Sequence, residues 1–153
     1  MNLDIPAPLK VEHEALHDTL KQATREPGAV GDAAREVARL LHPHFVREEE
    51  FAMPPLGLLS ALATGAPQAD MAEVIDIGRR LEAELPAMLA EHGEIVRALS
   101  QLEAAARAAG LPQYEKFASD LTLHAQTEEQ VLYPASILVG KYLALALGRG
   151  GQG

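Results

Sequence analysis

A duplicated arrangement of histidine and glutamate constrains this chain more than any other feature. The letters HFVREE begin at His44 and the letters HAQTEE begin at His124, so a histidine twice precedes a Glu-Glu pair. A leucine stands three residues before each of these histidines, an alanine six residues before, and a proline ten residues after. Self-similarity of this kind predicts two structural units built on one plan.

A second repeated element, the dipeptide EH, precedes each copy. The first EH ends at His13, 31 residues before His44, and the second ends at His92, 32 residues before His124. The chain therefore reads as two helical hairpins. Each hairpin carries a Glu-His pair on its first helix and an HxxxEE motif on its second helix.

The rest of the sequence has the character of helix. Apolar residues recur at spacings of three and four, and no stretch alternates as a strand does. The composition is 48% hydrophobic but only 4% aromatic, with many alanines and leucines, which favours helix over strand. We expect an all-α fold, an up-down-up-down four-helix bundle with an extra helical segment between its second and third helices. Residues 1–147 should form one domain, and residues 148–153 a disordered tail.

Prolines and glycines predict where the four helices begin and end. The first should run from about Pro8 to Arg25, the second from Asp32 as N-cap to just before Pro54, the third to Gly110, and the fourth to about Tyr133, before Pro134. The start of the third helix is open. A helical pattern resumes near Ala69, and Pro86 either kinks one long helix or begins a new one.

The two hairpins should bring four histidines to one level. Residues equidistant from the turn of an antiparallel hairpin lie at the same height. The midpoint of His13 and His44 falls at the first predicted turn, and that of His92 and His124 lies beside the second. Packing the hairpins together would then form a ring of histidine and glutamate inside the bundle.

A surplus segment lies beyond this level. Residues 56–84 are more than a minimal bundle needs, and residues 137–147 leave from the same end. We expect both to cover the open end near the ring or to form a dimer contact.

The ring should also contain glutamates. His44 with Glu48, and His124 with Glu128, are one helical turn apart and project together. On the fourth helix the same inward stripe continues from Glu128 to Leu132. A buried carboxylate without a partner costs several kcal/mol, so these groups either hydrogen-bond to one another or bind metal. Imidazole nitrogen with carboxylate oxygen suits iron, manganese or zinc, and carboxylates from facing helices can bridge two ions.

These motifs resemble those of the hemerythrin-like, or HHE cation-binding, family. The resemblance covers roughly residues 9–134 and rests on four motifs in order: EH, HxxxEE, EH and HxxxEE. It implies a four-helix bundle holding a non-haem centre of two iron ions, with zinc or manganese as alternative metals. It also implies His13, His44, His92 and His124 as terminal ligands, and Glu48 and Glu128 as bridging carboxylates.

One position departs from the family pattern. Hemerythrins proper carry two histidines one turn apart on the third helix, whereas here Met88 stands one turn before His92. The further candidates to fill this gap are His17, Glu49, Glu91, Glu129 or a water. In hemerythrin proper the last carboxylate lies five residues after its histidine, which would select Glu129 over Glu128.

Other interpretations compete with this one. His13 to His17 reads HExxH, the zinc-metalloprotease helix. Against it, no strand is predicted, and the repeat of His13 at His92 has no HExxH. A ferritin-like site needs ExxH on two helices, and only Glu14 to His17 fits. The remaining alternatives are a bundle that binds no metal and an interaction module. We expect Phe45, Phe51 and Tyr133 to pack near the site, and the sequence assigns no role to the Tyr133 hydroxyl.

Bulk properties narrow the function. The net charge of −9 argues against nucleic-acid binding, and the absence of cysteine excludes thiolate sites. No basic-then-apolar leader and no run long enough to cross a bilayer is present, so we expect a cytoplasmic monomer or homodimer with no membrane partner. The resemblance implies that the centre binds or senses a small oxidant or gas: oxygen, nitric oxide or peroxide. We favour a ligand-binding protein over a dedicated enzyme, with a peroxide- or nitric-oxide-consuming di-iron enzyme as the alternative.

Overall fold

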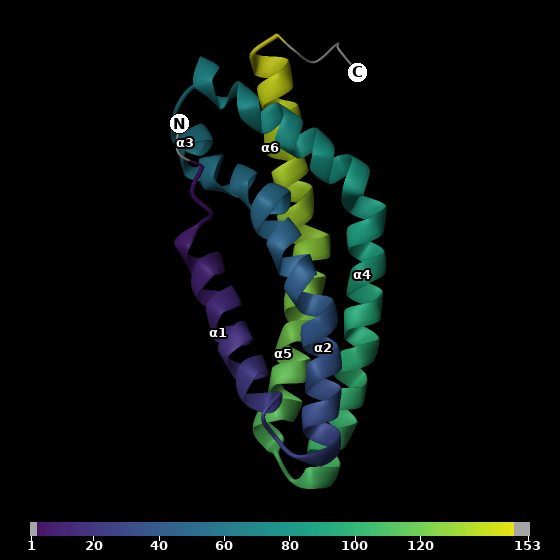
Figure 1. Ribbon diagram of the computed structural model, residues 1–153. Helices are drawn as coiled ribbons and strands as arrows, with labels where there is room; N and C mark the ends of the chain where they lie inside the picture. The colour runs from purple at the N-terminus through teal and green to yellow at the C-terminus, as the bar shows by residue number, and fades with distance from the viewer. Residues whose placement is uncertain (1–2, 149–153) are drawn as a thin grey trace.

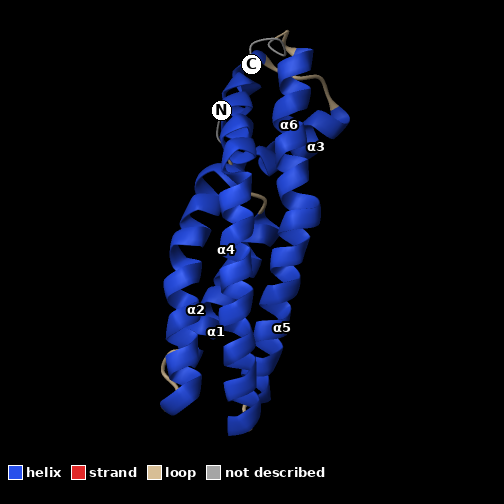
Figure 2. Cartoon of the chain, turned by 90° about the vertical axis from the view of Figure 1, so that its right-hand side faces the viewer, coloured by secondary structure: helices blue, strands red, loops and turns tan. Residues whose placement is uncertain are grey.

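The computed structural model describes residues 3–148, and every regular element in that range is helical (Figures 1 and 2). The α-helices are α1 (Ala7–Ala23), α2 (Gly28–Arg47), α3 (Leu59–Thr64), α4 (Glu73–Ala109), α5 (Pro112–Thr127) and α6 (Tyr133–Ala146). The all-α prediction is confirmed. Residues 149–153, most of the predicted tail, lie outside the described range. None of the helices within it combines the length and apolar character needed to cross a membrane.

Four helices form the lower part of the molecule in Figure 1. α1, α2, the lower part of α4 and α5 run side by side with alternating direction. Short turns join them at the lower end. Gly110 closes α4 in the left-handed region at φ 68°, where glycine is favoured. This is the predicted up-down-up-down bundle.

Two π-helical turns interrupt the bundle at matching places in the repeat. They are Glu48–Ala52, which follows α2, and Glu128–Leu132, which follows α5. Each begins at the first glutamate of an HxxxEE motif. In the first turn the N–H of Met53 donates to the carbonyl of Glu48, five residues back, at 2.8 Å. A π turn holds one residue more than an α turn, so it changes which later residues face the interior.

Two predicted boundaries were wrong. Asp32 is not an N-cap, because α2 begins at Gly28 directly after Pro27. Proline and a glycine at φ 70° complete the turn there, leaving no loop before Asp32. The fourth helix also does not stop before Pro134. It continues through the π turn into α6, where Pro134 occupies a first-turn position whose N–H is not needed.

The open question about Pro86 is answered by α4, which is one continuous helix with Pro86 inside it. Figure 1 shows α4 changing direction in its upper part. Proline bends a helix because it removes one hydrogen bond and its ring crowds the preceding turn. The bend carries the upper part of α4 across α6.

The surplus segment covers the upper end of the bundle, one of the two places expected for it. Pro54–Leu58, α3, Ala69–Ala72 and the upper part of α4 gather around α6 (Figure 1). A Cβ on Gly78 of α4 would lie only 3.2 Å from the Cα of Gly140 on α6, so glycine allows these helices to approach closely.

Apolar side chains form three clusters along the bundle. The lower cluster includes Leu20, Val37, Leu102 and Phe117; the middle one includes Phe51, Met53, Leu81, Met88 and Tyr133; the upper one includes Val74 and Leu143. The predicted ring of histidine and glutamate falls between the lower and middle clusters. Its polar groups are therefore shielded from water on both sides.

Candidate metal centre

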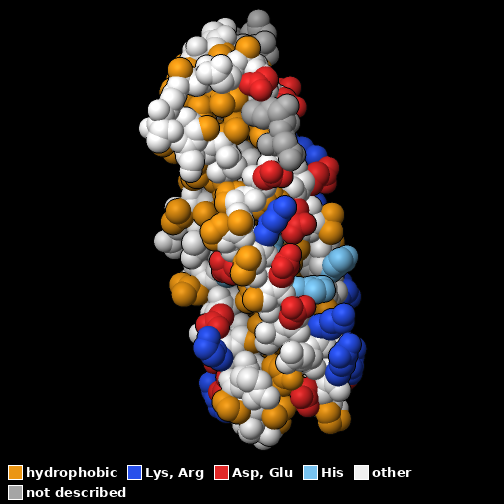
Figure 3. All heavy atoms as spheres, turned by 90° about the vertical axis from the view of Figure 1, so that its left-hand side faces the viewer, with side chains coloured by type: hydrophobic (Ala, Val, Ile, Leu, Met, Phe, Trp, Pro, Cys, Tyr) orange, Lys and Arg blue, Asp and Glu red, His pale blue; other side chains and the backbone are white. Residues whose placement is uncertain are grey.

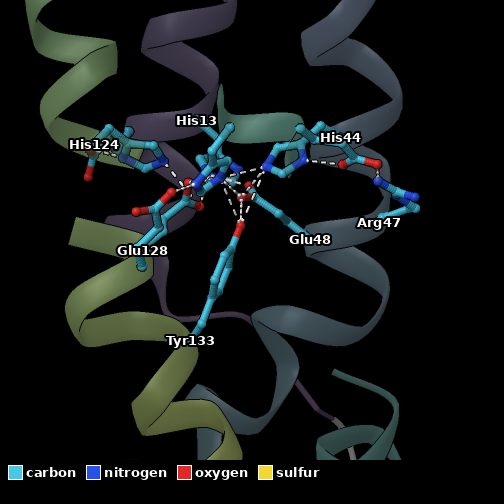
Figure 4. Close-up of polar contacts among 11 residues, drawn as sticks. His13, His44, Arg47, Glu48, His124, Glu128 and Tyr133 are labelled. Carbon is cyan, nitrogen blue, oxygen red and sulfur yellow. Dashed lines mark hydrogen bonds and ion pairs between the residues drawn. The ribbon is translucent and has the colours of Figure 1, made fainter. Parts of the chain in front are cut away.

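The six principal candidates from the sequence come together in one buried layer. His13 comes from α1, His44 and Glu48 from the end of α2, His92 from α4, and His124 and Glu128 from the end of α5. Every one of the six side chains is at most 5% exposed. Figure 4 shows labelled members of this layer pointing toward a common centre. Four helices thus place four imidazoles and two carboxylates inside an apolar bundle.

One half of the layer is formed by His13, His124 and the Oε2 atoms of the two glutamates. His13 Nε2 lies 3.5 Å from Oε2 of Glu48 and 3.9 Å from Oε2 of Glu128. His124 Nε2 lies 3.4 Å from the same oxygen of Glu128. These four atoms lie within 4.8 Å of one another, a separation at which all could bind one ion.

The other half is formed by His44, His92 and the Oε1 atoms of the same glutamates. His44 Nε2 lies 2.9 Å from Oε1 of Glu48, and His92 Nε2 lies 3.4 Å from Oε1 of Glu128. Each carboxylate therefore presents one oxygen to each half. Such an arrangement allows two ions to be bridged by both glutamates.

An outer layer of carboxylates faces the other nitrogen of each ring. His44 Nδ1 lies 2.7 Å from Glu91, His92 Nδ1 lies 3.0 Å from Glu129, and His124 Nδ1 lies 2.5 Å from Glu12. Glu49 stands 3.8 Å from Nδ1 of His13. Each outer carboxylate is adjacent in sequence to an inner-layer residue of its own helix and faces a histidine on a neighbouring helix. This arrangement explains why the sequence carries EH and EE dipeptides. A carboxylate that accepts from Nδ1–H leaves Nε2 free to bind metal and makes it more basic.

Three of the further candidate ligands therefore lie outside the inner layer. Glu91 and Glu129 hydrogen-bond to histidine Nδ1 atoms, Glu49 lies 3.8 Å from His13 Nδ1, and Glu91 also pairs with Arg47. Glu12 belongs to the first EH motif but was not among the candidate ligands, and Arg47 was not singled out. The signal that could have found Glu12 is its matching position to Glu91 in the repeat.

The two inner-layer glutamates each change the pKa of the other. Burial and the charge of Glu48 raise the pKa of Glu128 to about 7. Burial would raise the pKa of Glu48 as well, but hydrogen bonds with Glu128 and His44 outweigh burial and hold the pKa of Glu48 well below its ordinary value. The charge of each carboxylate thus disfavours ionisation of the other, because like charges this close cannot both ionise cheaply.

The histidines respond to the same carboxylates. Burial alone would lower the pKa of His92, but hydrogen bonds to Glu128 and Glu48 outweigh it and raise the pKa to about 10. Burial would also lower the pKa of His124, but the nearby carboxylate of Glu128, 3.4 Å away, raises it to about 9. At His13 burial wins and lowers the pKa. The layer therefore attracts positive charge, supplied by protons or by a metal cation.

Unpartnered buried atoms favour metal over hydrogen bonding alone. Four inner-layer atoms, Nε2 of His13 and of His124 and Oε2 of Glu48 and of Glu128, have no hydrogen-bond partner among the described residues. All four face the same point. Buried polar atoms without partners are costly, and one cation at that point would satisfy them together.

The contact between His44 and His92 supports the same conclusion. Their Nε2 atoms lie 2.9 Å apart. When His92 is protonated this contact is a hydrogen bond to His44; when both rings are neutral and donate from Nδ1 to their carboxylates, two lone pairs face each other, and a cation between them would take the place of the proton. Neighbouring ligands of one ion, each at about 2.1 Å and at right angles, lie about 3 Å apart. The residues present fit a bound metal.

The family comparison agrees with this geometry. The model of the hemerythrin HHE cation-binding domain matches residues 4–136 of the chain.

The chain belongs to the hemerythrin HHE cation-binding family.

The match covers the four-helix bundle and ends at the start of α6. No curated protein and no solved structure matches the chain. Membership shows a cation-binding bundle, and the buried His/Glu groups are where a cation would be held.

His17 does not fill the gap left by Met88. Its side chain is exposed and lines a surface pocket of about 360 Å³ with His13, Glu14 and His42. Figure 3 shows exposed histidine among acidic side chains on the α1 side of the molecule. Both histidines line the pocket, but only His13 belongs to a group of donor atoms close enough to bind one ion. The two histidines therefore do not form the shared ligand pair that HExxH requires. The bundle therefore speaks against the protease interpretation.

Tyr133 was expected to pack near the site, and the structure brings its hydroxyl into the layer itself, a role that the sequence did not assign. It is fully buried, and its hydroxyl donates to Oε1 of Glu48 at 2.5 Å. In the view of Figure 4 the Tyr133 side chain extends from the lower part of the picture to the point where the dashed lines converge. The α-helical stripe through His124 and Glu128 predicted Leu132 at this height. The π turn shifts the inward position by one residue, to Tyr133.

Proposed function

We propose that the protein binds two iron ions in the buried layer and that the ion pair takes up a small oxidant or gas. The observation that carries the proposal is the set of four unpartnered buried atoms on His13, Glu48, His124 and Glu128. Nitrogen and oxygen donors in this ratio, without thiolate, suit iron, with zinc or manganese as competitors.

Each half of the layer would hold one ion. His13 and His124 would bind one ion, and His44 and His92 the other, with Glu48 and Glu128 bridging both. Bound iron would supply open coordination positions and one-electron redox steps to oxygen, nitric oxide or peroxide. The protein's own part is to hold the ligands in place and to keep water away.

The surroundings suit a small ligand rather than a large substrate. Apolar clusters lie directly below and above the layer. The pocket of about 360 Å³ reaches His13, whose ring stacks on Phe45 with centroids 4.2 Å apart. A diatomic molecule or peroxide could approach the His13 end from this side. A peptide would not reach the buried donors.

Anaerobic loading with ferrous iron tests the proposal. We expect two irons per chain by elemental analysis, and new charge-transfer absorption after oxygen, peroxide or nitric oxide is added. Failure to take up iron, or uptake of a single zinc ion in its place, would overturn the proposal. Repeated consumption of peroxide or nitric oxide would identify an enzyme, and a single stoichiometric uptake a binding protein.

A further inference from the structure

Tyr133 gives the two halves of the layer different surroundings. Its hydroxyl lies 3.1 Å from Nε2 of His92 and 3.4 Å from Nε2 of His44, in addition to its contact with Glu48. These are three of the four side chains that line one half, the fourth being Glu128. The phenol oxygen is thus a fifth donor atom facing the same point as two imidazoles and two carboxylate oxygens.

Within residues 3–148, the other half has no such donor. In the repeat, the position equivalent to Tyr133 is Met53, which is fully buried in the middle apolar cluster. Four donor atoms face each other there, two from histidines and two from glutamates. The asymmetry arises from a single residue pair, because the π turns that precede Met53 and Tyr133 match.

Met88 lies on the same side as Tyr133. Both are fully buried and belong to the middle apolar cluster, one turn above the histidines. Met88 is the position where hemerythrins proper carry their extra histidine, so the donor missing from α4 is matched by an oxygen that comes from α6. Thioether sulfur is a poor ligand for hard ferric iron, whereas phenol oxygen is a good one.

We propose that Tyr133 is a ligand of the ion held by His44 and His92. The proposal rests on the proposed function, since it requires that half to bind metal. The phenolic proton, now donated to Glu48, leaves for solvent when a ferric ion binds the oxygen. The ion at this half then has five protein donors and the ion at the His13 half has four. Open positions for a small ligand therefore concentrate at the His13 half, beside the surface pocket.

The test compares the wild-type protein with Tyr133→Phe and Tyr142→Phe. Tyr142 lies on the same helix but is 46% exposed and remote from the layer, so it is a matched control. Each protein is loaded with two equivalents of ferrous iron, oxidised, and examined by absorption and resonance Raman spectroscopy, with iron counted per chain.

We expect phenolate-to-iron charge transfer in the wild type and in Tyr142→Phe, and its loss in Tyr133→Phe. Affinity for one of the two irons should also fall in Tyr133→Phe, by at least the roughly tenfold that loss of an outer partner costs. The phenylalanine ring keeps the buried shape. Should that variant nevertheless misfold, ring-deuterated tyrosine in the wild type decides, because the Raman bands shift only if a tyrosine is bound.

Two negative outcomes have different meanings. Two irons per chain with no phenolate band, and unchanged affinity in Tyr133→Phe, would overturn the ligand assignment and leave the proposed function standing. No iron uptake by the wild type would overturn both.

Discussion

The two hairpins share the HxxxEE motif, but the structures that follow the motif differ. Both HxxxEE motifs lead into a π turn, and both π turns lead to a proline. After Pro54 the chain makes a short 3-10 turn and leaves the bundle, whereas after Pro134 it continues as the 14-residue helix α6. The repeated residues therefore determine the ligand layer, and the residues after each proline determine the structure above that layer.

Local chemistry explains the divergence. Pro54 is followed by Pro55, so two consecutive N–H donors are missing and the preceding helix does not continue through them. Gly57 then lets the backbone pass close to Asp4, since a Cβ there would be 2.2 Å from the Asp4 carbonyl oxygen. Pro134 is followed by Ala-Ser-Ile, which continues a helix readily. As a result, of the two hairpins as described, the second places a tyrosine against the layer and the first places Met53 at the equivalent position.

The largest expected effect comes from removing a residue that both halves share. Glu48→Ala should abolish binding of both ions, because Oε1 and Oε2 face different histidine pairs. Metal per chain, measured by elemental analysis after loading and desalting, should fall from two to near zero. Glu50→Ala, which removes an exposed carboxylate two residues away, should keep two. Retention of one ion by Glu48→Ala would mean that the halves bind independently.

Removing one histidine should separate the halves. His13→Ala should lose one ion and keep the phenolate band, and His44→Ala should lose one ion and the band with it. Each variant removes one imidazole from one half only, as the distances require. Iron counting together with absorption spectroscopy reads both effects. The same spectrum in both variants would contradict the proposed difference between the halves.

Raising the pH should lower the stability of the metal-free protein and increase the stabilisation that metal provides. Without metal, the folded protein holds protons on His92, His124 and Glu128 at pH values where the unfolded chain has released them, since their pKa values are raised to about 10, 9 and 7. Their stabilising contribution is complete below the unfolded pKa values and is lost as pH rises toward 10. The Tm of the metal-free protein should therefore fall between pH 6 and 9.

Metal must displace those protons, so its stabilisation should grow over the same range. At a zinc concentration 100 times Kd the stabilisation is about 2.7 kcal/mol, and the Tm increment caused by zinc should be larger at pH 8 than at pH 6. Thermal scans with zinc and with a chelator measure both trends. An increment that shrinks as pH rises would mean that the bound cation does not use these groups.

The smallest effect should come from the outer carboxylates. Glu91→Gln removes the charge that accepts from His44 Nδ1, and should weaken metal binding at that half about 10- to 100-fold without unloading the other. Glu94→Gln, an exposed position on the same helix, is the control. Competition with a chromophoric chelator gives the two affinities separately. Equal weakening at both halves would show that Glu91 acts through the bundle rather than through His44.

Much of the site could be predicted because its residues share helical faces. His44 with Glu48, and His124 with Glu128, are one α turn apart, and the spacing of three and four alone places each pair on the apolar stripe. The repeat then brings the pairs to one height. Leu132 was expected at the place that Tyr133 occupies, because nothing local in the letters EEQVLYP distinguishes a π turn from an α turn.

What the sequence determined by itself is the set of helices and the polar layer within them, because helical periodicity depends on residues within one or two turns of each other. Only the tertiary structure decided how the outer carboxylates pair, since Glu12 and His124 are 112 residues apart and meet across two helices. It also decided that Tyr133 enters the layer. That placement requires a π turn, a proline that does not end the helix, and the packing of α6 against α4, none of which is set by local periodicity.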